Sequence, residues 1–173
     1  YNSSSPDAED NDPARISLGQ LRRLQYMSDA DHGYQINGVT DNQENQLRYT
    51  IVGSLMRVDL VGPLPAGGDT ELVVDFEFDI INGNVLSPRG GYEYFPDDEN
   101  EGGNYIFALS QWFPRLVAYT DYEGWTNKEF LGSGEFTLEF GDYDVEITVP
   151  EDHIVASTGE LQNSDNVLTR AQR

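Results

Sequence analysis

From about Tyr34 onward, apolar and polar residues alternate along the chain with a period of two. The segment "ELVVDFEFDII" shows this most clearly. Its apolar positions are Leu72, Val74, Phe76, Phe78 and Ile80, and its acidic positions are Asp75, Glu77 and Asp79. Successive side chains of a strand point to opposite faces, so this pattern predicts a half-buried antiparallel β-strand.

A second long candidate strand, "QLRYTIVGSLMRVDLV", changes the phase of its alternation part of the way along. The apolar residues fall on odd positions at first, as at Ile51, and on even positions later, as at Val58. A bulge or a turn near Gly53 would correct this register. The following "VGPLPAGGD" supplies proline and glycine turn signals.

The later candidate strands are short and are bounded by Gly, Asp, Asn or Pro. They are "NYIFALS", "RLVAYT", "GEFTLEF", "DYDVEITV" and "HIVAST", with "FGDYD" as a hairpin turn between two of them. The predicted fold class is therefore all-β and mainly antiparallel, as a sandwich or a large curved sheet.

The first 33 residues differ from the rest of the chain. Residues 1–15 are rich in Ser, Asp, Asn and Pro, and they predict a disordered tail or linker because they cannot bury enough apolar surface. In "ISLGQLRRLQYM", Leu18, Leu21 and Leu24 recur every three residues, which predicts a short amphipathic helix that Gly19 weakens.

Charge limits the partners of this chain. Its 173 residues carry a formal net charge of −21, and Lys128 is the single lysine. Such a surface repels phosphate groups, so neither nucleic acid binding nor membrane insertion is expected, and no apolar run is long enough to cross a bilayer. Two interpretations of the acidity stay open: a surface that aids solubility, or adaptation to high salt.

The chain offers little for metal or nucleophilic chemistry. It has no cysteine, which excludes disulfides and thiolate ligands. His32 and His153 lie far apart and in no H-E-x-x-H motif, so no catalytic zinc is expected. "GSGE" around Ser133 lacks the G-x-S-x-G pattern of a nucleophile.

One acidic loop partly matches a calcium site. "DDENEGGN" places Asp97, Glu99 and Glu101 on alternate positions with Gly102 sixth, as an EF-hand loop begins. The twelfth position is Ala108, where such a loop needs a bidentate glutamate. A solvated acidic loop is therefore the preferred interpretation.

The stretch "SQWFPRLVAYTDYEGWTNKEF" concentrates large rings and polar groups. Gln111 and Arg115 fit poorly in a core, because buried amide and guanidinium groups demand partners. Their position predicts the rim of a cleft. The rings themselves fit either a core or a carbohydrate-stacking platform; they are Trp112, Phe113, Tyr119, Tyr122 and Trp125.

"NYIFALSQWFPRLVAYTD" and "GEFTLEFGDYDVEITVPEDHIVASTGEL" together resemble the N-terminal β domain of aminopeptidase N-like zinc metallopeptidases, in a bacterial subgroup. "GYEYFPDD" is similar to the Gly-Tyr segment that precedes them in this family. The resemblance covers roughly residues 34 to 162. The positions that carry it are Ser110, Gln111, Arg115, Asp121, Phe136, Val149, Pro150, Ala156 and Ser157.

The resemblance implies a saddle-like β domain that performs no chemistry itself. In the family, a thermolysin-like domain that follows it holds one zinc through H-E-x-x-H and a distant Glu, and hydrolyses the N-terminal peptide bond. The expected partners of this chain are thus a catalytic domain of the same polypeptide and a peptide substrate. Gln111 is carried over as a residue that lines the pocket for the substrate amine and first side chain. No cofactor is expected in this chain, and zinc is expected in the parent.

Two departures from the family pattern change the expected site. Phe113 stands where relatives often have a polar residue that contacts the amine, so it is expected to shape an apolar pocket for the first side chain. The family's proline-containing turn is reduced to "YTDYEG", with an insertion through "WTNKEFLGSG", in which Trp125 is expected to anchor packing.

The expected organisation is a tail at 1–15, a β domain at 16–162 that lacks its opening strands, and the start of a linker to an absent catalytic domain at 163–173. The alternatives are a stand-alone β-sandwich module that binds carbohydrate through Trp112 and Trp125, or a structural interaction domain. No compartment is assigned, although a periplasmic or extracellular one is favoured.

Overall fold

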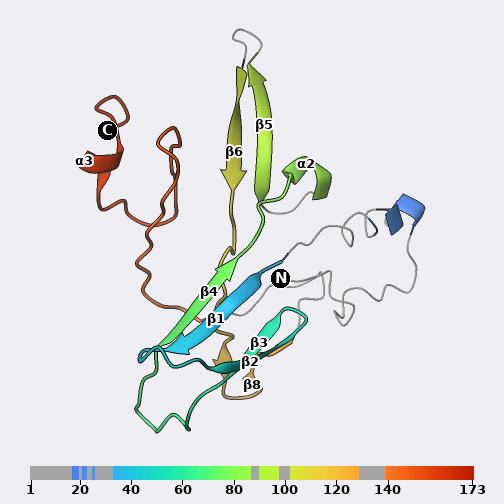
Figure 1. Ribbon diagram of the computed structural model, residues 1–173, viewed down its shortest axis with the longest axis vertical. Coiled ribbons are helices and arrows are strands. Elements are labelled where there is room, and N and C mark those ends of the chain that lie inside the picture. Colours follow the sequence, from blue (N-terminus) through green and yellow to red (C-terminus); the bar gives the residue numbers. More distant parts are fainter. Residues whose placement is uncertain are drawn as a thin grey trace. The chain divides into compact units, whose positions relative to one another are not determined.

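The computed structural model describes residues 17–19, 21–22, 25, 33–86, 90–97, 102–128 and 139–173. The chain divides into two units, residues 1–139 and residues 140–173. The first unit contains all the strands that follow, and the second contains one short helix. Figure 1 shows the elements along the chain.

Four antiparallel two-stranded sheets make up the strand content of the described residues. β1 (Gln35–Asp41) pairs with β4 (Leu72–Glu77), and β2 (Arg48–Val52) with β3 (Leu55–Asp59). β5 (Gly91–Asp97) pairs with β6 (Gly102–Ala108), and β7 (Tyr119–Thr120) with β8 (Gly124–Trp125). The predicted all-β, mainly antiparallel class is confirmed, in the form of small sheets that do not close.

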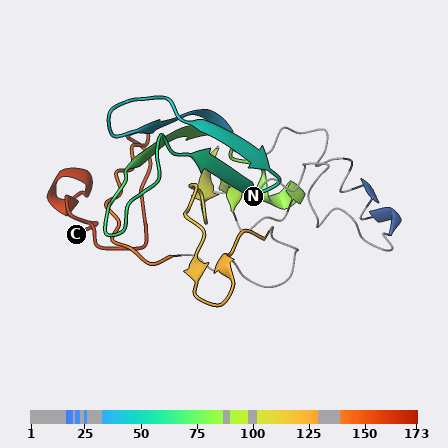
Figure 2. The same ribbon diagram turned by 90° about the horizontal axis from the view of Figure 1, so that it is seen from below.

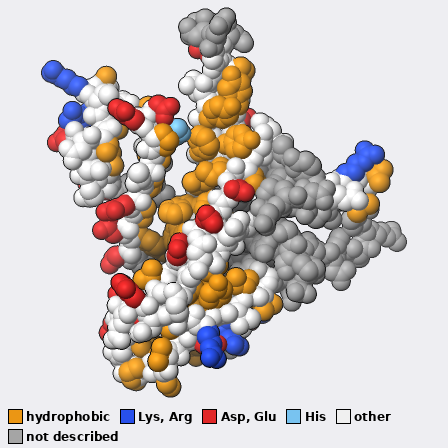
Figure 3. All heavy atoms as spheres, viewed as in Figure 1, with side chains coloured by type: hydrophobic (Ala, Val, Ile, Leu, Met, Phe, Trp, Pro, Cys, Tyr) orange, Lys and Arg blue, Asp and Glu red, His pale blue; other side chains and the backbone are white. Residues whose placement is uncertain are grey.

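The β1–β4 ladder confirms the alternation in the middle of "ELVVDFEFDII", whereas Leu72 and Ile80, at the two ends of the predicted apolar face, are 40% and 37% exposed. Val74, Phe76 and Phe78 are half-buried, whereas the acids between and after them are exposed, and Figure 3 shows acidic side chains along β4. Tyr34 packs edge-on against both phenylalanines, with ring centroids 5.4 Å apart in each pair. The register shifts once, between Ile36 and Gly38, which marks a bulge in β1.

The phase change near Gly53 is a tight hairpin turn between β2 and β3. Val52 pairs with Leu55, so only Gly53 and Ser54 lie in the loop. Gly53 has a φ of 55°, in the left-handed region, and two-residue hairpin turns favour glycine in such a position.

The buried core of the described residues is small. Val39 on β1 is 0% exposed and Leu47, just before β2, is 7% exposed. The Leu47 amide donates to the Val39 carbonyl at 2.8 Å, and the Tyr49 hydroxyl donates to the Ile36 carbonyl at 3.2 Å. These bonds tie β1 to the β2–β3 hairpin around Val39 and Leu47. The third buried apolar residue of the described chain, Ala118, is 5% exposed.

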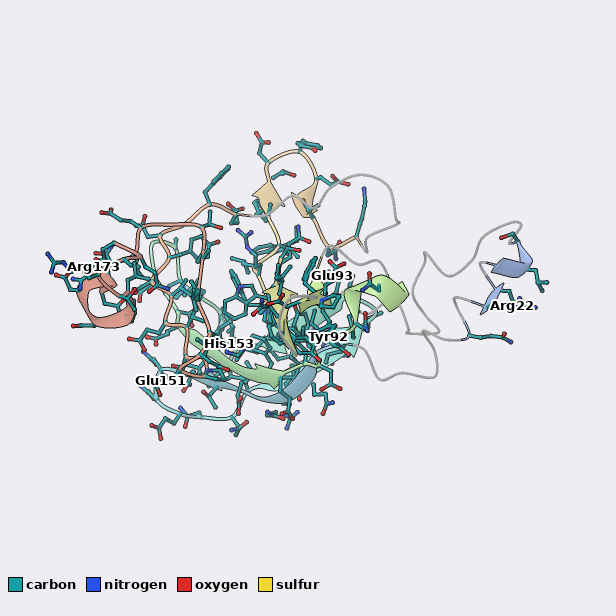
Figure 4. All side chains as sticks on the ribbon, turned by 90° about the horizontal axis from the view of Figure 1, so that it is seen from above. Arg22, Tyr92, Glu93, Glu151, His153 and Arg173 are labelled. Atoms are coloured by element: carbon teal, nitrogen blue, oxygen red, sulfur yellow. The ribbon has the colours of Figure 1, made fainter. Side chains whose placement is uncertain are left out.

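One face of the β5–β6 hairpin carries a ladder of rings from Tyr92, Tyr94, Tyr105 and Phe107. The closest pair, Tyr94 and Tyr105, has centroids 5.0 Å apart and directly opposed positions in the register. Apolar side chains follow this hairpin in Figure 3, and Tyr92 and its neighbour Glu93 are labelled in Figure 4. Cross-strand ring pairs of this kind stabilise a sheet.

The base of this hairpin is joined to α2 (Gly83–Leu86). The Tyr92 amide donates to the Ile81 carbonyl at 2.8 Å, and the Asn82 side chain accepts from the Asn84 amide at 3.0 Å, as a helix cap does. Gly91 has a φ of 129°, and a Cβ there would lie 2.5 Å from the Ile81 carbonyl oxygen. Only glycine fits this junction without a shift of the backbone.

Residues 140–173 contain α3 (Ser164–Val167) and no strand. The strands predicted at "DYDVEITV" and "HIVAST" are therefore not formed there. The backbone hydrogen bonds of this unit join near neighbours, as from the His153 amide to the Pro150 carbonyl at 3.0 Å. Alternation can define the two faces of a strand, but a ladder also needs a partner strand.

The predicted N-terminal helix is described at a few positions. Leu18, Gly19, Leu21, Arg22 and Gln25 have helical backbone, and the Leu21 amide donates to the Ser17 carbonyl at 2.9 Å. Leu24 and the predicted tail at 1–15 lie outside the described residues. Within the described ranges, no helix has the length and apolarity needed to cross a bilayer.

Candidate functional site

Gln111 lies in the segment that leads from β6 to β7, where the backbone takes an uncommon conformation. Its φ is 52°, one of two positive values among the non-glycine residues described. The Tyr34 hydroxyl donates to the Gln111 carbonyl at 2.8 Å, across 77 positions of sequence. The Gln111 side chain is exposed, whereas Tyr34 is half-buried and its burial raises the pKa of its hydroxyl. The Gln111 backbone carbonyl is thus anchored by a hydrogen bond, while the residue itself is exposed to solvent.

Phe113, the second predicted site residue, is half-buried beside two neighbours. The Trp112 ring meets it edge-on at a centroid distance of 5.1 Å, and the Arg115 guanidinium carbon lies 5.9 Å from its centroid. The latter geometry fits a weak cation–π contact. Arg115 also donates from Nη2 to the Glu139 carbonyl at 3.1 Å. Within this short segment, Gln111 is exposed to solvent, whereas the Phe113 ring packs against Trp112 and Arg115.

Figure 2 draws the β7–β8 hairpin in orange. Several of the rings on this hairpin are exposed to solvent. Tyr119 and Trp125 are paired in the register and meet edge-on, with centroids 5.2 Å apart. Tyr119 is 60% exposed and Trp125 is 53% exposed, so Trp125 is not packed as closely as an anchor would be. An ion pair between Lys128 and Glu123 joins the turn of the hairpin to the residues that follow it.

The histidine and metal candidates of the sequence give no centre within the described residues. His153, labelled in Figure 4, lies beside Asp152 with Nδ1 2.7 Å from Oδ1. No group of three or more His, Asp or Glu side chains in the described ranges is placed to hold a metal ion. His32, Ser133 and residues 98–101 of the acidic loop lie outside those ranges.

The sequence reasoning missed a cavity between the loops at 41–46 and 60–70. It has a volume of about 270 Å³, and Leu47 and Asp41 are among its lining residues. By its proline and glycine content, "VGPLPAGGD" indicates only a turn. The proline and leucine residues of that segment could have indicated an apolar surface. The loop that faces this surface is set by the pairing of β1 with β4, which the segment itself does not reveal.

The chain matches no family model, no curated protein and no solved structure.

Proposed function

We propose that this chain is the non-catalytic β domain of a zinc aminopeptidase, and that it covers the active-site cleft of a catalytic domain in the same polypeptide. In this role it lines the pocket that receives the substrate amine and first side chain, while hydrolysis of the N-terminal peptide bond takes place on the other domain. The zinc and its ligands belong to that domain.

The observation that carries the proposal is the anchored backbone of Gln111. A non-glycine residue at a φ of 52° is strained by roughly 1–2 kcal/mol. Such strain persists only where neighbouring contacts maintain it, and it occurs often at functional sites. Here the Tyr34 hydroxyl holds the carbonyl at 2.8 Å. The backbone that carries the exposed side chain is thereby fixed in place, as is required of a residue that lines a substrate pocket.

Exposed apolar surface gives further support. On the β5–β6 hairpin, large side chains on both faces are accessible, including Tyr94, Tyr105 and Ile106. A patch of this kind on an isolated chain is expected where a neighbouring domain packs.

Two variants of Gln111 test the role of its side chain in the protein encoded by the complete reading frame. Gln111→Gly removes the amide and also relieves the strained φ, so its melting temperature should stay equal or rise. Gln111→Ala removes the amide and keeps the strain. Both should lower kcat/KM for an aminoacyl substrate about 2- to 10-fold, the effect of one hydrogen bond.

Gln162→Ala, in the second unit, is the matched control and should leave kcat/KM unchanged. Wild-type kcat/KM in both Gln111 variants would contradict the assigned role. The reading frame must also encode an H-E-x-x-H motif downstream of Arg173, and its absence would overturn the whole proposal.

The 173-residue chain alone provides a separate test. Incubated with zinc and a fluorogenic aminoacyl substrate, it should show no turnover above a buffer blank. Zinc-dependent turnover that a chelator abolishes would mean that this chain carries a catalytic centre of its own.

The exposed rings of the β7–β8 hairpin favour a second candidate, a stand-alone carbohydrate-binding module. Trp125 and Tyr119 are the rings that would stack on a neutral sugar, whereas Trp112 is half-buried. A glycan screen with Trp125→Ala and Trp112→Ala distinguishes the candidates. Binding that Trp125→Ala alone abolishes would favour the module, and a screen without hits would remove it.

A further inference from the structure

The cavity between the loops at 41–46 and 60–70 lies in the part of the first unit that holds Val39 and Leu47. Leu47 is 7% exposed and lines it from the core side. Leu60, Leu64 and Pro65 line it as apolar walls. Its volume of about 270 Å³ is just below the 300–1,000 Å³ of most ligand sites, so an occupant would be small.

Asp41, at the end of β1, is held in the cavity wall by four hydrogen bonds. Its Oδ1 accepts from the amides of Gln43 and Asn45 at 2.9 Å each and from Asn45 Nδ2 at 3.2 Å. Its Oδ2 accepts from Asn45 Nδ2 at 3.0 Å. Because a carboxylate oxygen has two lone pairs, Oδ2 can accept a further bond from a ligand.

These contacts also keep Asp41 ionised. The hydrogen bond from the Asn45 side chain, followed by that from the Asn45 backbone, lowers the pKa of the Asp41 carboxyl below its ordinary value. A carboxylate fixed in this way presents a constant negative charge next to the leucine and proline walls.

The charge of the two loops favours a cation. Segments 41–47 and 60–71 contain Asp41, Glu44, Asp69 and Glu71 and no Lys, Arg or His. The next residue, Arg48, begins β2 and lies opposite Asp59 in the register. On the adjoining hairpin, the Arg57 guanidinium is paired with Asp59 at 3.1 Å. Among the residues that line the cavity, Asp41 is the only acid. Sites for divalent metal ions commonly combine several carboxylates, and this lining offers one, so the site fits an organic cation better.

We propose that this cavity binds a small organic ammonium ion, whose nitrogen donates to Asp41 Oδ2 and whose apolar body lies against Leu60 and Leu64. An ammonium group offers three donors for the carboxylate, and charge-assisted bonds are the stronger kind. The body of the ligand removes exposed leucine and proline surface from water. This site is separate from the segment around Gln111, and it does not depend on the proposed aminopeptidase role.

The test is an NMR titration of the isotope-labelled 173-residue chain with cyclohexylammonium chloride at constant ionic strength. We expect saturable amide shifts confined to residues 41–47 and 60–70, with a Kd on the order of 1 mM. Cyclohexanol has the same ring without the charge, and cyclohexanecarboxylate reverses the charge. Neither should produce saturable shifts in these loops at the same concentration.

Two variants measure separately how the Asp41 charge and the apolar wall at Leu64 contribute to ligand binding. Asp41→Asn keeps an oxygen that can accept from the Gln43 and Asn45 amides, so the turn should remain, but it should weaken binding about 2- to 5-fold. Leu64→Asn, at a side chain that is 48% exposed, should also weaken binding without unfolding the chain. Asp75→Asn removes one exposed charge from β4, outside the cavity, and is the matched control.

Three results would overturn the proposal. The first is an absence of saturable shifts in these loops, and the second is equal binding of cyclohexanol. The third is an unchanged Kd in Asp41→Asn while its spectrum shows the native fold.

Discussion

At the scale of single residues, the buried side chains of the first unit matter more than their small number suggests. Val39 is 0% exposed and lies opposite Val74 in the β1–β4 register. Its carbonyl also accepts from the Leu47 amide. Removing its two methyl groups would leave space at the point where β1 meets the β2–β3 hairpin.

We therefore expect Val39→Ala to lower the free energy of unfolding by about 2 kcal/mol, from lost burial and a residual cavity. Val61→Ala removes the same atoms from a side chain that is 83% exposed, and it should change stability by less than about 0.5 kcal/mol. Urea unfolding of both variants measures the difference. Equal values for the two would mean that Val39 is not part of a packed core.

Asp152 supplies a prediction of pH dependence at the same scale. The hydrogen bond from His153 and the positive charge of its ring lower the pKa of Asp152 from its ordinary 3.8. Because the folded pKa is the lower one, the stabilisation is present above pH 3.8 and is lost as the pH falls through the folded value. NMR titration of the Asp152 carboxyl should show a return toward 3.8 in His153→Gln. An unchanged titration midpoint in that variant would exclude the pair as the cause.

At the scale of elements, the strands that alternation predicts at β4, β2–β3 and β6 are formed because each has an antiparallel partner strand: β1 for β4, β2 and β3 for each other, and β5 for β6. "RLVAYT" forms a strand only at its last two residues, Tyr119 and Thr120. "DYDVEITV" has equally regular alternation and forms none. Periodicity describes one strand at a time, whereas a ladder depends on which other segment supplies the matching hydrogen bonds.

The β5–β6 hairpin depends on a junction that tolerates only glycine. Gly91→Ala would place a methyl group 2.5 Å from the Ile81 carbonyl oxygen at a φ of 129°. We expect a loss of at least about 1–3 kcal/mol of stability. Gly102→Ala, on β6 of the same hairpin, meets nothing within 4 Å and should be neutral. Thermal unfolding of the two variants compares them, and a Gly91→Ala variant as stable as Gly102→Ala would rule out this contact.

At the scale of the whole molecule, sequence alone predicted the fold class and the charge but only part of the candidate site. The sequence identifies Gln111 and Arg115 as polar groups among rings, and the structure adds that Arg115 donates to the Glu139 carbonyl. The bond from Tyr34 to Gln111 spans 77 positions, and no local pattern could have indicated it. The cavity between the loops at 41–46 and 60–70 likewise depends on strand pairing that brings the two loops together, so the sequence of neither loop alone predicts it.

The net charge of −21 leads to the last prediction. Repulsion between exposed acids opposes the compact state, and the Debye length falls from about 10 Å at 0.1 M salt to about 3 Å at 1 M. We expect the melting temperature to rise by several degrees between low and molar NaCl.

Neutralising the acidic face of β4 tests the cause of that rise. Asp75→Asn combined with Glu77→Gln and Asp79→Asn should raise the melting temperature at low salt and reduce its salt dependence, because less repulsion remains to be screened. If the triple variant keeps the full salt dependence, the effect arises from acids elsewhere on the chain. If the wild-type melting temperature does not rise with salt, adaptation to high salt is excluded, and the acidity is better explained as a means of solubility.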